Sequence, residues 1–206
     1  EKRMKSFFAL PAILTLCAGV TFFGNSAMAA PSLNISGNNI NIKEPLTEEF
    51  AKQFSDAMAA KKVQNSLAIT IAKADNATLA KVCEMAPGIG KLTVTEGKNI
   101  NDLKPLAKLT NLTALSLEGI TATDCSPLAG LTKLTSFNMS NDAISDVKFM
   151  KDMKLLKSLT LRGKNISDLS GLPSIPSLSK VHICSAADLT PITTAFPNLS
   201  KLDLNY

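Results

Sequence analysis

The sequence has 206 residues, of which 45% are hydrophobic, and it contains nine phenylalanines, one tyrosine and no tryptophan. A core so poor in large aromatic residues must be filled by leucine, isoleucine, valine and methionine, which favours many similar small layers over one large globular core. The formal net charge is +5 and there is one histidine. This mild basic excess argues against a nucleic-acid-binding protein, and one histidine with scattered cysteines argues against a zinc site.

Residues 1–29 predict a secretory signal peptide. A basic start at Lys2, Arg3 and Lys5 precedes a nearly uninterrupted apolar run over 7–23, and Ala27-Met28-Ala29 then offers the small residues that a signal peptidase requires. We expect cleavage after Ala29 and export of a mature chain to the periplasm or the exterior. Loss of three basic residues and one acidic residue leaves that chain with a small positive charge.

Two other interpretations of this segment are a membrane anchor and a lipoprotein signal. The apolar run is about the shortest that can span a bilayer, and the cleavage site follows it directly, so a cleaved signal is favoured. Leu16 is too bulky for lipoprotein processing at Cys17. We therefore expect no integral membrane segment in the mature chain.

Residues 30–88 predict a cap and a divergent first repeat. Residues 32–42 alternate apolar and polar around Gly37-Asn38-Asn39, which predicts a strand or a hairpin. Over 67–71 another strand is expected, and 72–86 predicts a helical return through Leu79, Val82 and Met85.

Residues 43–62 predict an amphipathic helix that caps the N-terminal end of the repeat array. Thr47, followed by two glutamates, suits a helix start. The apolar residues at helical spacing are Leu46, Phe50, Phe54, Ala57 and Met58. Terminal units of a repeat array need such a cover, and we expect Phe50 and Phe54 to provide most of it.

A repeat of about 22 residues dominates the rest of the chain. Its leading leucines are Leu112, Leu134, Leu156, Leu178 and Leu199, which step by 22, 22, 22 and 21 residues. Each begins a segment of the form Leu-x-x-apolar-x-apolar, and a degenerate copy precedes them over 89–94. The last two apolar residues of this segment are two positions apart, which predicts a short strand with one buried face. The six predicted strands contain Leu92, Leu115, Phe137, Leu159, Val181 and Leu202.

The second half of each unit carries an Asp followed four places later by an apolar residue. The Asp residues are Asp102, Asp124, Asp146, Asp168 and Asp188. A carboxylate at this place can accept hydrogen bonds from the N–H groups that open a helical or 3₁₀ turn. We expect structural roles for Asp124, Asp146 and Asp168. Each unit is then a strand, a turn and a short helical return, and stacked units form one parallel sheet.

This pattern resembles the leucine-rich repeats of the internalins, bacterial surface and secreted proteins, over residues 89–206. The resemblance implies an α/β repeat fold: a curved solenoid whose parallel sheet lines the concave face and binds a protein partner. The buried asparagine ladder of such repeats is not found three places after the strands, where this sequence has Ile120, Asp142, Lys164 and Ala186. An immunoglobulin-like domain and a cell-wall anchor motif are also missing after the repeats. Only the scaffold is therefore carried over.

Residues that flank the buried strand positions are expected to point to the concave face. The candidate protein-binding residues are Thr93, Ser116, Glu118, Asn138, Ser140, Thr160, Arg162, Lys180, His182, Lys201 and Asp203. Their charge gathers toward the C-terminal repeats, and none of them is aromatic. A merely solvated sheet face is the alternative interpretation.

One constellation could suggest an enzyme: His182 and Cys184 lie two apart on one predicted strand, with Asp203 beside His182 on the next. Two residues along a strand are about 6.6 Å apart, too far for easy hydrogen bonding, and no glycine motif for an oxyanion hole is near. We expect no enzymatic activity and no cofactor or metal. Cys125 occupies a core column and Cys83 a helical return, so both are expected to be buried thiols.

The sequence thus predicts an exported protein-binding module, directed at a host cell or at the cell envelope. The alternative is a self-associating structural protein of the envelope. The chain ends two residues after the buried strand position Leu204. An uncovered last layer would expose Leu199, Leu202 and Leu204, so weak self-association through this edge is expected, unless the chain is truncated or a partner covers it.

Overall fold

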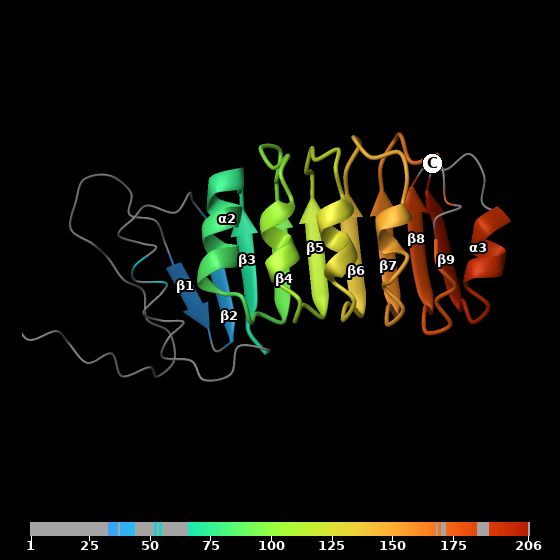
Figure 1. The fold of residues 1–206 in the computed structure, drawn as a ribbon, viewed down its shortest axis with the longest axis horizontal. Helices are drawn as coiled ribbons and strands as arrows, with labels where there is room; N and C mark the ends of the chain where they lie inside the picture. Colours follow the sequence, from blue (N-terminus) through green and yellow to red (C-terminus); the bar gives the residue numbers. More distant parts are fainter. Residues whose placement is uncertain are drawn as a thin grey trace, which may run out of the picture.

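A computed structural model describes residues 33–36, 38–43, 52, 54, 66–167, 169, 172–184 and 190–205. Within them a single sheet runs in sequence order from β1 to β9, as Figure 1 shows. The strands are β1 (Leu33–Ser36), β2 (Asn39–Ile42), β3 (Ala68–Ala72), β4 (Lys91–Thr95), β5 (Ala114–Glu118), β6 (Ser136–Ser140), β7 (Ser158–Arg162), β8 (Lys180–Cys184) and β9 (Lys201–Asn205). The returns contain α2 (Asn76–Met85), η1 (Lys104–Lys108), η2 (Ser126–Gly130), η3 (Lys148–Met150) and α3 (Thr190–Ala195).

The sheet is parallel from β2 to β9, and only β1 pairs antiparallel, with β2. Of the two alternatives expected over 32–42, a strand or a hairpin, the structure shows the hairpin. The single parallel sheet of the six repeat strands is confirmed. The parallel pairing also reaches further toward the N-terminus than the sequence repeat, because β2 and β3 already pair in parallel. Equivalent positions of successive repeats lie side by side, as in the pair Leu115 and Phe137.

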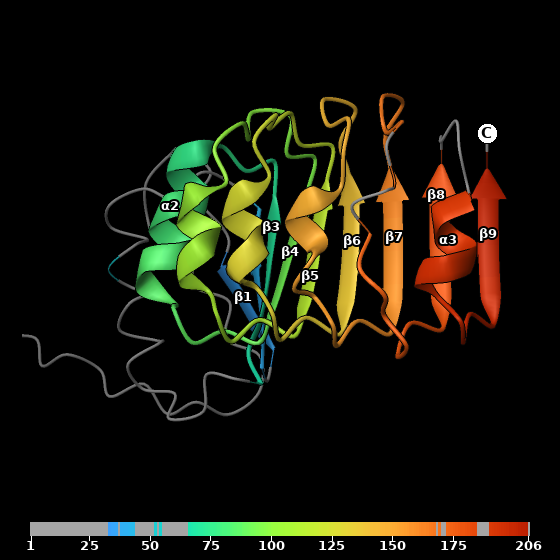
Figure 2. The same cartoon turned by 45° about the vertical axis from the view of Figure 1, so that its right-hand side comes forward.

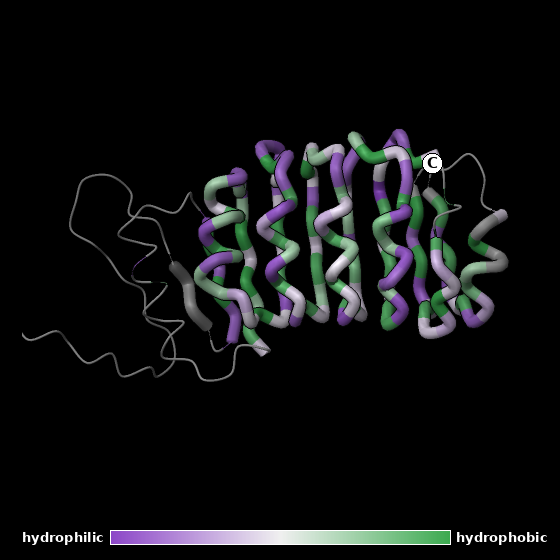
Figure 3. Tube along the Cα trace, viewed as in Figure 1, coloured by the Kyte–Doolittle hydropathy of each residue, from purple (hydrophilic) through white to green (hydrophobic). Residues whose placement is uncertain are grey.

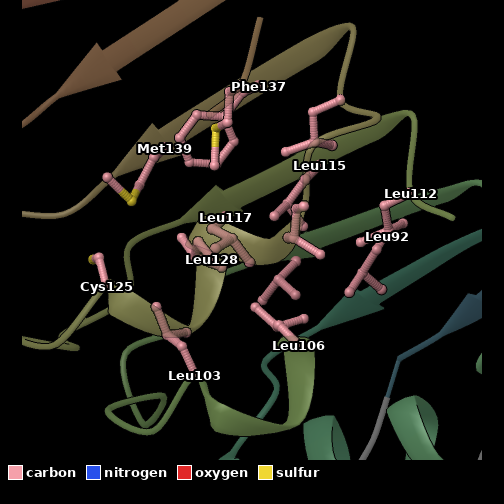
Figure 4. Packing of buried hydrophobic residues seen from close by; sticks show 14 of the residues in the cluster. Leu92, Leu103, Leu106, Leu112, Leu115, Leu117, Cys125, Leu128, Phe137 and Met139 are labelled. Carbon is pink, nitrogen blue, oxygen red and sulfur yellow. The ribbon is translucent and has the colours of Figure 1, made fainter. Parts of the chain in front are cut away.

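The core lies between the sheet and the returns. Strand residues alternate between buried and partly exposed, as period two requires. In Figure 4, Leu92, Leu115 and Phe137 of three successive strands lie in one packed layer with Leu106 and Leu128 of the returns. Figure 3 shows the same alternation as apolar and polar segments that recur in every turn of the solenoid. Each unit therefore buries its apolar edge only against its neighbours.

The Asp residues of the returns stabilise the start of each 3₁₀ turn. Oδ1 of Asp102, Asp124 and Asp146 accepts a hydrogen bond from the backbone N–H two residues later, at 2.9, 2.9 and 3.0 Å. The Ser126 hydroxyl and its N–H lower the pKa of Asp124, because both donate to the charged carboxylate. The predicted structural role is confirmed for Asp124 and Asp146, whereas Asp168 lies outside the described residues.

The N-terminal part agrees with the sequence where the structure describes it. β3 and α2 match the expected strand and helical return, and Leu79 and Val82 are buried. Asp75 caps α2 by accepting from Thr78 N–H at 2.8 Å. Most of the predicted helix over 43–62 lies outside the described residues, Phe50 included. Lys52 and Phe54 are described as helical, and the Phe54 side chain is fully buried.

The residues three places after the strands form no asparagine ladder where the structure describes them. Ile120 is buried where the ladder would place an asparagine, and Asp142 and Lys164 are exposed. Ala186 lies outside the described residues. A buried asparagine nevertheless occurs one place earlier than expected, at Asn141, with 1% exposure. Its Nδ2 donates to the Ala122 carbonyl of the preceding repeat at 2.6 Å, and its Oδ1 accepts from Ala143 N–H at 2.8 Å.

A second link between repeats is a column of hydroxyl groups just before the strands. Each hydroxyl donates to a backbone carbonyl of the preceding repeat, at 2.8 to 3.1 Å. The donors are Thr113, Thr135, Ser179 and Ser200. Lys157 stands at the corresponding place before β7.

In the part of the chain that is described, no helix is both long and apolar enough to cross a membrane.

Candidate protein-binding face

The returns all lie on one side of the sheet, as Figure 2 shows, which leaves the other side uncovered by them. We call this side the open face. It corresponds to the face on which the sequence placed the candidate binding residues. Parallel pairing without slippage determines which of these residues become neighbours.

The central column of the open face runs across six strands. Each residue is the direct Cα partner of the next and each is half-buried: Thr93, Ser116, Asn138, Thr160, His182 and Asp203. Glu118, Ser140 and Arg162 form a shorter column beside it. Lys180 and Lys201 are exposed partners on its other side. The structure thus brings all eleven predicted residues to one face of the sheet.

The middle of the open face carries a hydrogen-bonded cluster of three polar side chains. Asn138 Nδ2 donates to Ser116 Oγ at 2.9 Å and to Glu118 Oε1 at 3.3 Å, and Ser116 Oγ donates to Glu118 Oε1 at 3.4 Å. Among the described residues, Asn138 Oδ1 is the one buried side-chain oxygen or nitrogen without a hydrogen-bond partner. Such an atom is an exception among buried polar groups, which normally have a hydrogen-bond partner.

The C-terminal end of the open face is charged. Lys201 Nζ lies 3.1 Å from Asp203 Oδ2, whereas His182 Nδ1 lies 4.0 Å from the same oxygen. The longer distance exceeds a hydrogen bond, and the carboxylate is held by Lys201 instead. The side chain of Cys184 lies outside the described part of the structure.

Cys83 and Cys125 are free and buried, as the sequence predicts. The pKa of each thiol is raised to about 12, mainly by burial, and for Cys125 the nearby Asp124 and Asp146 carboxylates contribute to this rise. The reactive species of a cysteine is the thiolate, which is scarce at neutral pH when the pKa is so high. Both cysteines therefore serve as small apolar core residues. Nowhere in the described ranges do three His, Cys, Asp or Glu side chains gather as metal ligands.

The open face is longer than the sequence analysis predicts. Thr70 of β3 is the Cα partner of Thr93, and Asn41 of β2 is in turn the partner of Thr70. Both residues are half-buried. The alternation of apolar and polar residues over 67–71 could have indicated that this strand belongs to the open face. The sequence repeat is too weak before residue 89, however, to align this strand with the later columns.

No protein-family model matches the sequence, and no curated protein matches it. Among the solved structures that match is internalin C2 from Listeria monocytogenes str. 4b F2365, with 25% sequence identity and a TM-score of 0.62. The match covers 82% of this chain and 80% of that one. The resemblance inferred from the repeats therefore extends to the three-dimensional fold.

Proposed function

We propose that this internalin-like leucine-rich-repeat protein is an exported module that binds a protein partner on its open face. The observation that carries the proposal is the central column of six polar residues in register across β4 to β9, on the side that the returns do not cover. The other side of the sheet packs against the returns and forms the core. Long uncovered sheet faces of this kind are the binding surfaces of repeat proteins.

The charges and polar groups of the open face indicate which chemical groups a partner would present. Glu118 lies in the middle, whereas exposed Arg162, Lys180 and Lys201 lie toward the C-terminal end. A partner with donors opposite the Asn138 cluster and carboxylates opposite the C-terminal repeats would be complementary. None of the predicted positions is Trp, Tyr or Phe, so anchors of these types would come from the partner. Arg162 is the residue type on this face most often found as a hot spot.

Site-specific photo-crosslinking tests this proposal. A benzoylphenylalanine at Thr160, in the central column, should capture a discrete protein from host-cell extract or from the bacterial envelope. The same group at Ala107, exposed in η1 on the side of the returns, is the matched control. Arg162→Ala should weaken the captured complex about fivefold or more. Equal capture from both positions, or none from Thr160, would contradict the proposal.

Export is tested separately. Expressed in a bacterium from its own N-terminus, the protein should be found outside the cytoplasm with Ala30 as its first residue. Ala27→Lys puts a large charged side chain where the peptidase requires a small one, so cleavage should fail. An uncleaved wild-type protein in the cytoplasm would rule out the signal.

The second candidate function is self-association through the C-terminal edge. Leu202 of β9 is 42% exposed, and Leu199 and Leu204 are only partly buried. An edge strand that shows an apolar side chain can pair with another copy. Light scattering should show that the average mass of the particles rises with protein concentration. This rise should be absent in the Leu202→Lys variant. Leu155→Lys, at the other large hydrophobic residue that is exposed in the described part of the chain, is the control. A monomer at all concentrations would contradict this candidate.

We also propose that the protein has no enzymatic activity, because a leucine-rich-repeat fold like that of internalin C2 is suited to a protein-interaction scaffold. A screen for hydrolysis of ester and peptide substrates, compared between the wild type and His182→Ala, tests this. Turnover that depends on His182 would refute it.

A further inference from the structure

One return segment carries a lysine at every third position. Over 147–153 the chain makes hydrogen bonds of the 3₁₀ kind, and η3 itself spans Lys148–Met150: Met150 N–H donates to Val147 O at 3.0 Å, Lys151 N–H to Lys148 O at 3.4 Å and Met153 N–H to Met150 O at 2.9 Å. Residues three apart eclipse each other in such a helix. Val147, Met150 and Met153 accordingly point inward and are fully buried, and so is Leu156 three places further on. The next residue in each case is an exposed lysine, and we call Lys148, Lys151, Lys154 and Lys157 the lysine stripe.

The fold does not require lysines at these places. One repeat earlier, the equivalent residues are Ser126, Ala129, Thr132 and Thr135. Two repeats earlier they are Lys104, Ala107, Thr110 and Thr113. The inward column has the same character in all three repeats, so these repeats share their packing and differ in the outward column. A single acidic residue, the exposed Asp152, lies within 148–157.

Leu155 makes this segment unusual in a second way. It is 53% exposed, between Lys154 and Lys157. The corresponding residues of the other repeats are polar and make hydrogen bonds between repeats. Lys133 Nζ donates to Asn111 Oδ1 at 2.7 Å, Ser177 Oγ to the Leu156 carbonyl at 2.7 Å, and Asn198 Nδ2 to the Pro176 carbonyl at 2.9 Å. A leucine at this place can make none of these bonds, and it leaves an apolar side chain among cations.

We propose that the lysine stripe and Leu155 form a second interaction surface, which docks on an anionic lipid bilayer. The lysine ammonium groups attract the phosphate-bearing headgroups, and Leu155 enters the boundary between headgroups and acyl chains. Lysines act as flexible point charges that impose no fixed geometry on their partner, which suits a fluid surface better than a folded protein. An isolated apolar side chain among them matches the layered polarity of a membrane surface.

The position of this surface leaves the open face available. η3 lies on the side of the sheet with the other returns, as Figure 2 shows, and the open face is on the opposite side. A protein held on a bilayer by the lysine stripe would direct its open face away from that bilayer. The inference does not depend on the proposed protein-binding function, since it uses none of the residues of the open face.

Vesicle sedimentation with the full chain tests the inference. The wild type should bind vesicles of phosphatidylglycerol, bind vesicles of phosphatidylcholine much more weakly, and lose binding as salt is raised. The variant with Lys148→Ser, Lys151→Ala, Lys154→Thr and Lys157→Thr takes its residues from the preceding repeat, so its fold should be retained. A lysine near an anionic surface contributes about fivefold in affinity, so this variant should bind at least about a hundredfold more weakly.

The matched control removes the same charge elsewhere. Lys73, Lys98, Lys104 and Lys108 are exposed residues of preceding segments. Changing Lys73 to Asn, which tolerates its positive φ of 54°, and the other three to Thr should reduce binding far less than the stripe variant does. Leu155→Asn, the residue of the equivalent position 111, should weaken binding about threefold to tenfold by removing the apolar contact. Circular dichroism checks that each variant is folded.

Several results would overturn the inference. They are a wild type that does not bind phosphatidylglycerol vesicles, equal binding to both kinds of vesicle, and equal loss in the stripe variant and the control. Binding to soluble polyglutamate at least as strong as to vesicles, with no effect of Leu155→Asn, would replace the membrane with an acidic polypeptide as the partner. Photo-crosslinking at Thr160 reports on the open face independently, so failure of one proposal can be distinguished from failure of the other.

Discussion

Replacement of Asn141 by alanine should destabilise the solenoid between its fifth and sixth strands. The side chain is buried at 1% exposure, and it is the donor to the Ala122 carbonyl at 2.6 Å. Ala122 is itself fully buried, so water cannot replace the lost donor. A buried acceptor left without a partner costs about 1–3 kcal/mol, and the lost side-chain volume adds to this. We expect a loss of about 2–3 kcal/mol in the free energy of unfolding, measured by urea titration with circular dichroism.

Asn165→Ala is the matched control. Asn165 Nδ2 also donates to a carbonyl of the preceding repeat, that of Asp142 at 2.6 Å, but this bond is exposed. Water can satisfy the freed carbonyl there, so the loss should stay within about 0.5 kcal/mol. If Asn141→Ala costs no more than Asn165→Ala, burial of the bond is not what makes Asn141 important, and the argument fails.

Asn141→Asp separates the donor from the acceptor. The aspartate can still accept from Ala143 N–H, but it places an oxygen against the Ala122 carbonyl. Burial should raise the folded-state pKa of this carboxyl above its unfolded value of about 3.9. The loss relative to wild type should therefore be largest above the folded pKa and should diminish as the pH falls toward the unfolded value. A loss that is independent of pH would show that the carboxyl does not ionise in place.

Three further predictions concern other parts of the solenoid. Gly163→Ala should cost about 1–3 kcal/mol in the same urea titration, because an added Cβ would collide with the backbone carbonyl oxygen of Asn141; an unchanged midpoint would mean that the two loops can move apart. Phe54→Ala should cost about 3–5 kcal/mol, since this side chain is fully buried, whereas the exposed Lys52→Ala should not change the melting temperature; a stable Phe54→Ala protein would show that the N-terminal segment is no cap. Asp75→Ala should cost about 1 kcal/mol at neutral pH by removing the cap of α2. The Thr78 hydroxyl and N–H lower the pKa of the Asp75 carboxyl, so its contribution is present above the unfolded pKa and is lost as the pH falls through the lower folded value; a wild-type advantage that persists in strong acid would contradict this.

The candidate binding face was predictable from the sequence because a strand has a fixed period of two. Once Leu115 and Leu117 are assigned to the core, Ser116 and Glu118 must point away from it. Repeats of constant length then align Ser116 with Asn138 on the next strand, as the structure confirms. The start of the face was missed because 67–71 is too divergent to be aligned with the later repeats.

The hydrogen bonds within the face were not predictable in the same way. That Asn138 contacts Ser116 and Glu118, and that Asp203 is nearer to Lys201 than to His182, depends on side-chain rotamers. These rotamers depend on the side chains of the neighbouring strands. The lysine stripe, by contrast, was visible as a spacing of three at 148, 151, 154 and 157. Only the structure shows that all four of these lysines are exposed beside a fully buried inward column.

The sequence by itself determined the repeat unit, the parallel order of its strands and the residues of the core. The physical reason is that one unit cannot bury its own apolar edge. A periodic apolar pattern is therefore buried only when the units stack on one another. Only the tertiary structure decided which polar residues are needed inside that stack. Asn141 is buried because the carbonyl of Ala122 requires a donor, and Gly163 is tolerated beside Asn141 because it has no Cβ. Both requirements come from a neighbouring repeat about 20 residues away, whose backbone positions no local pattern specifies.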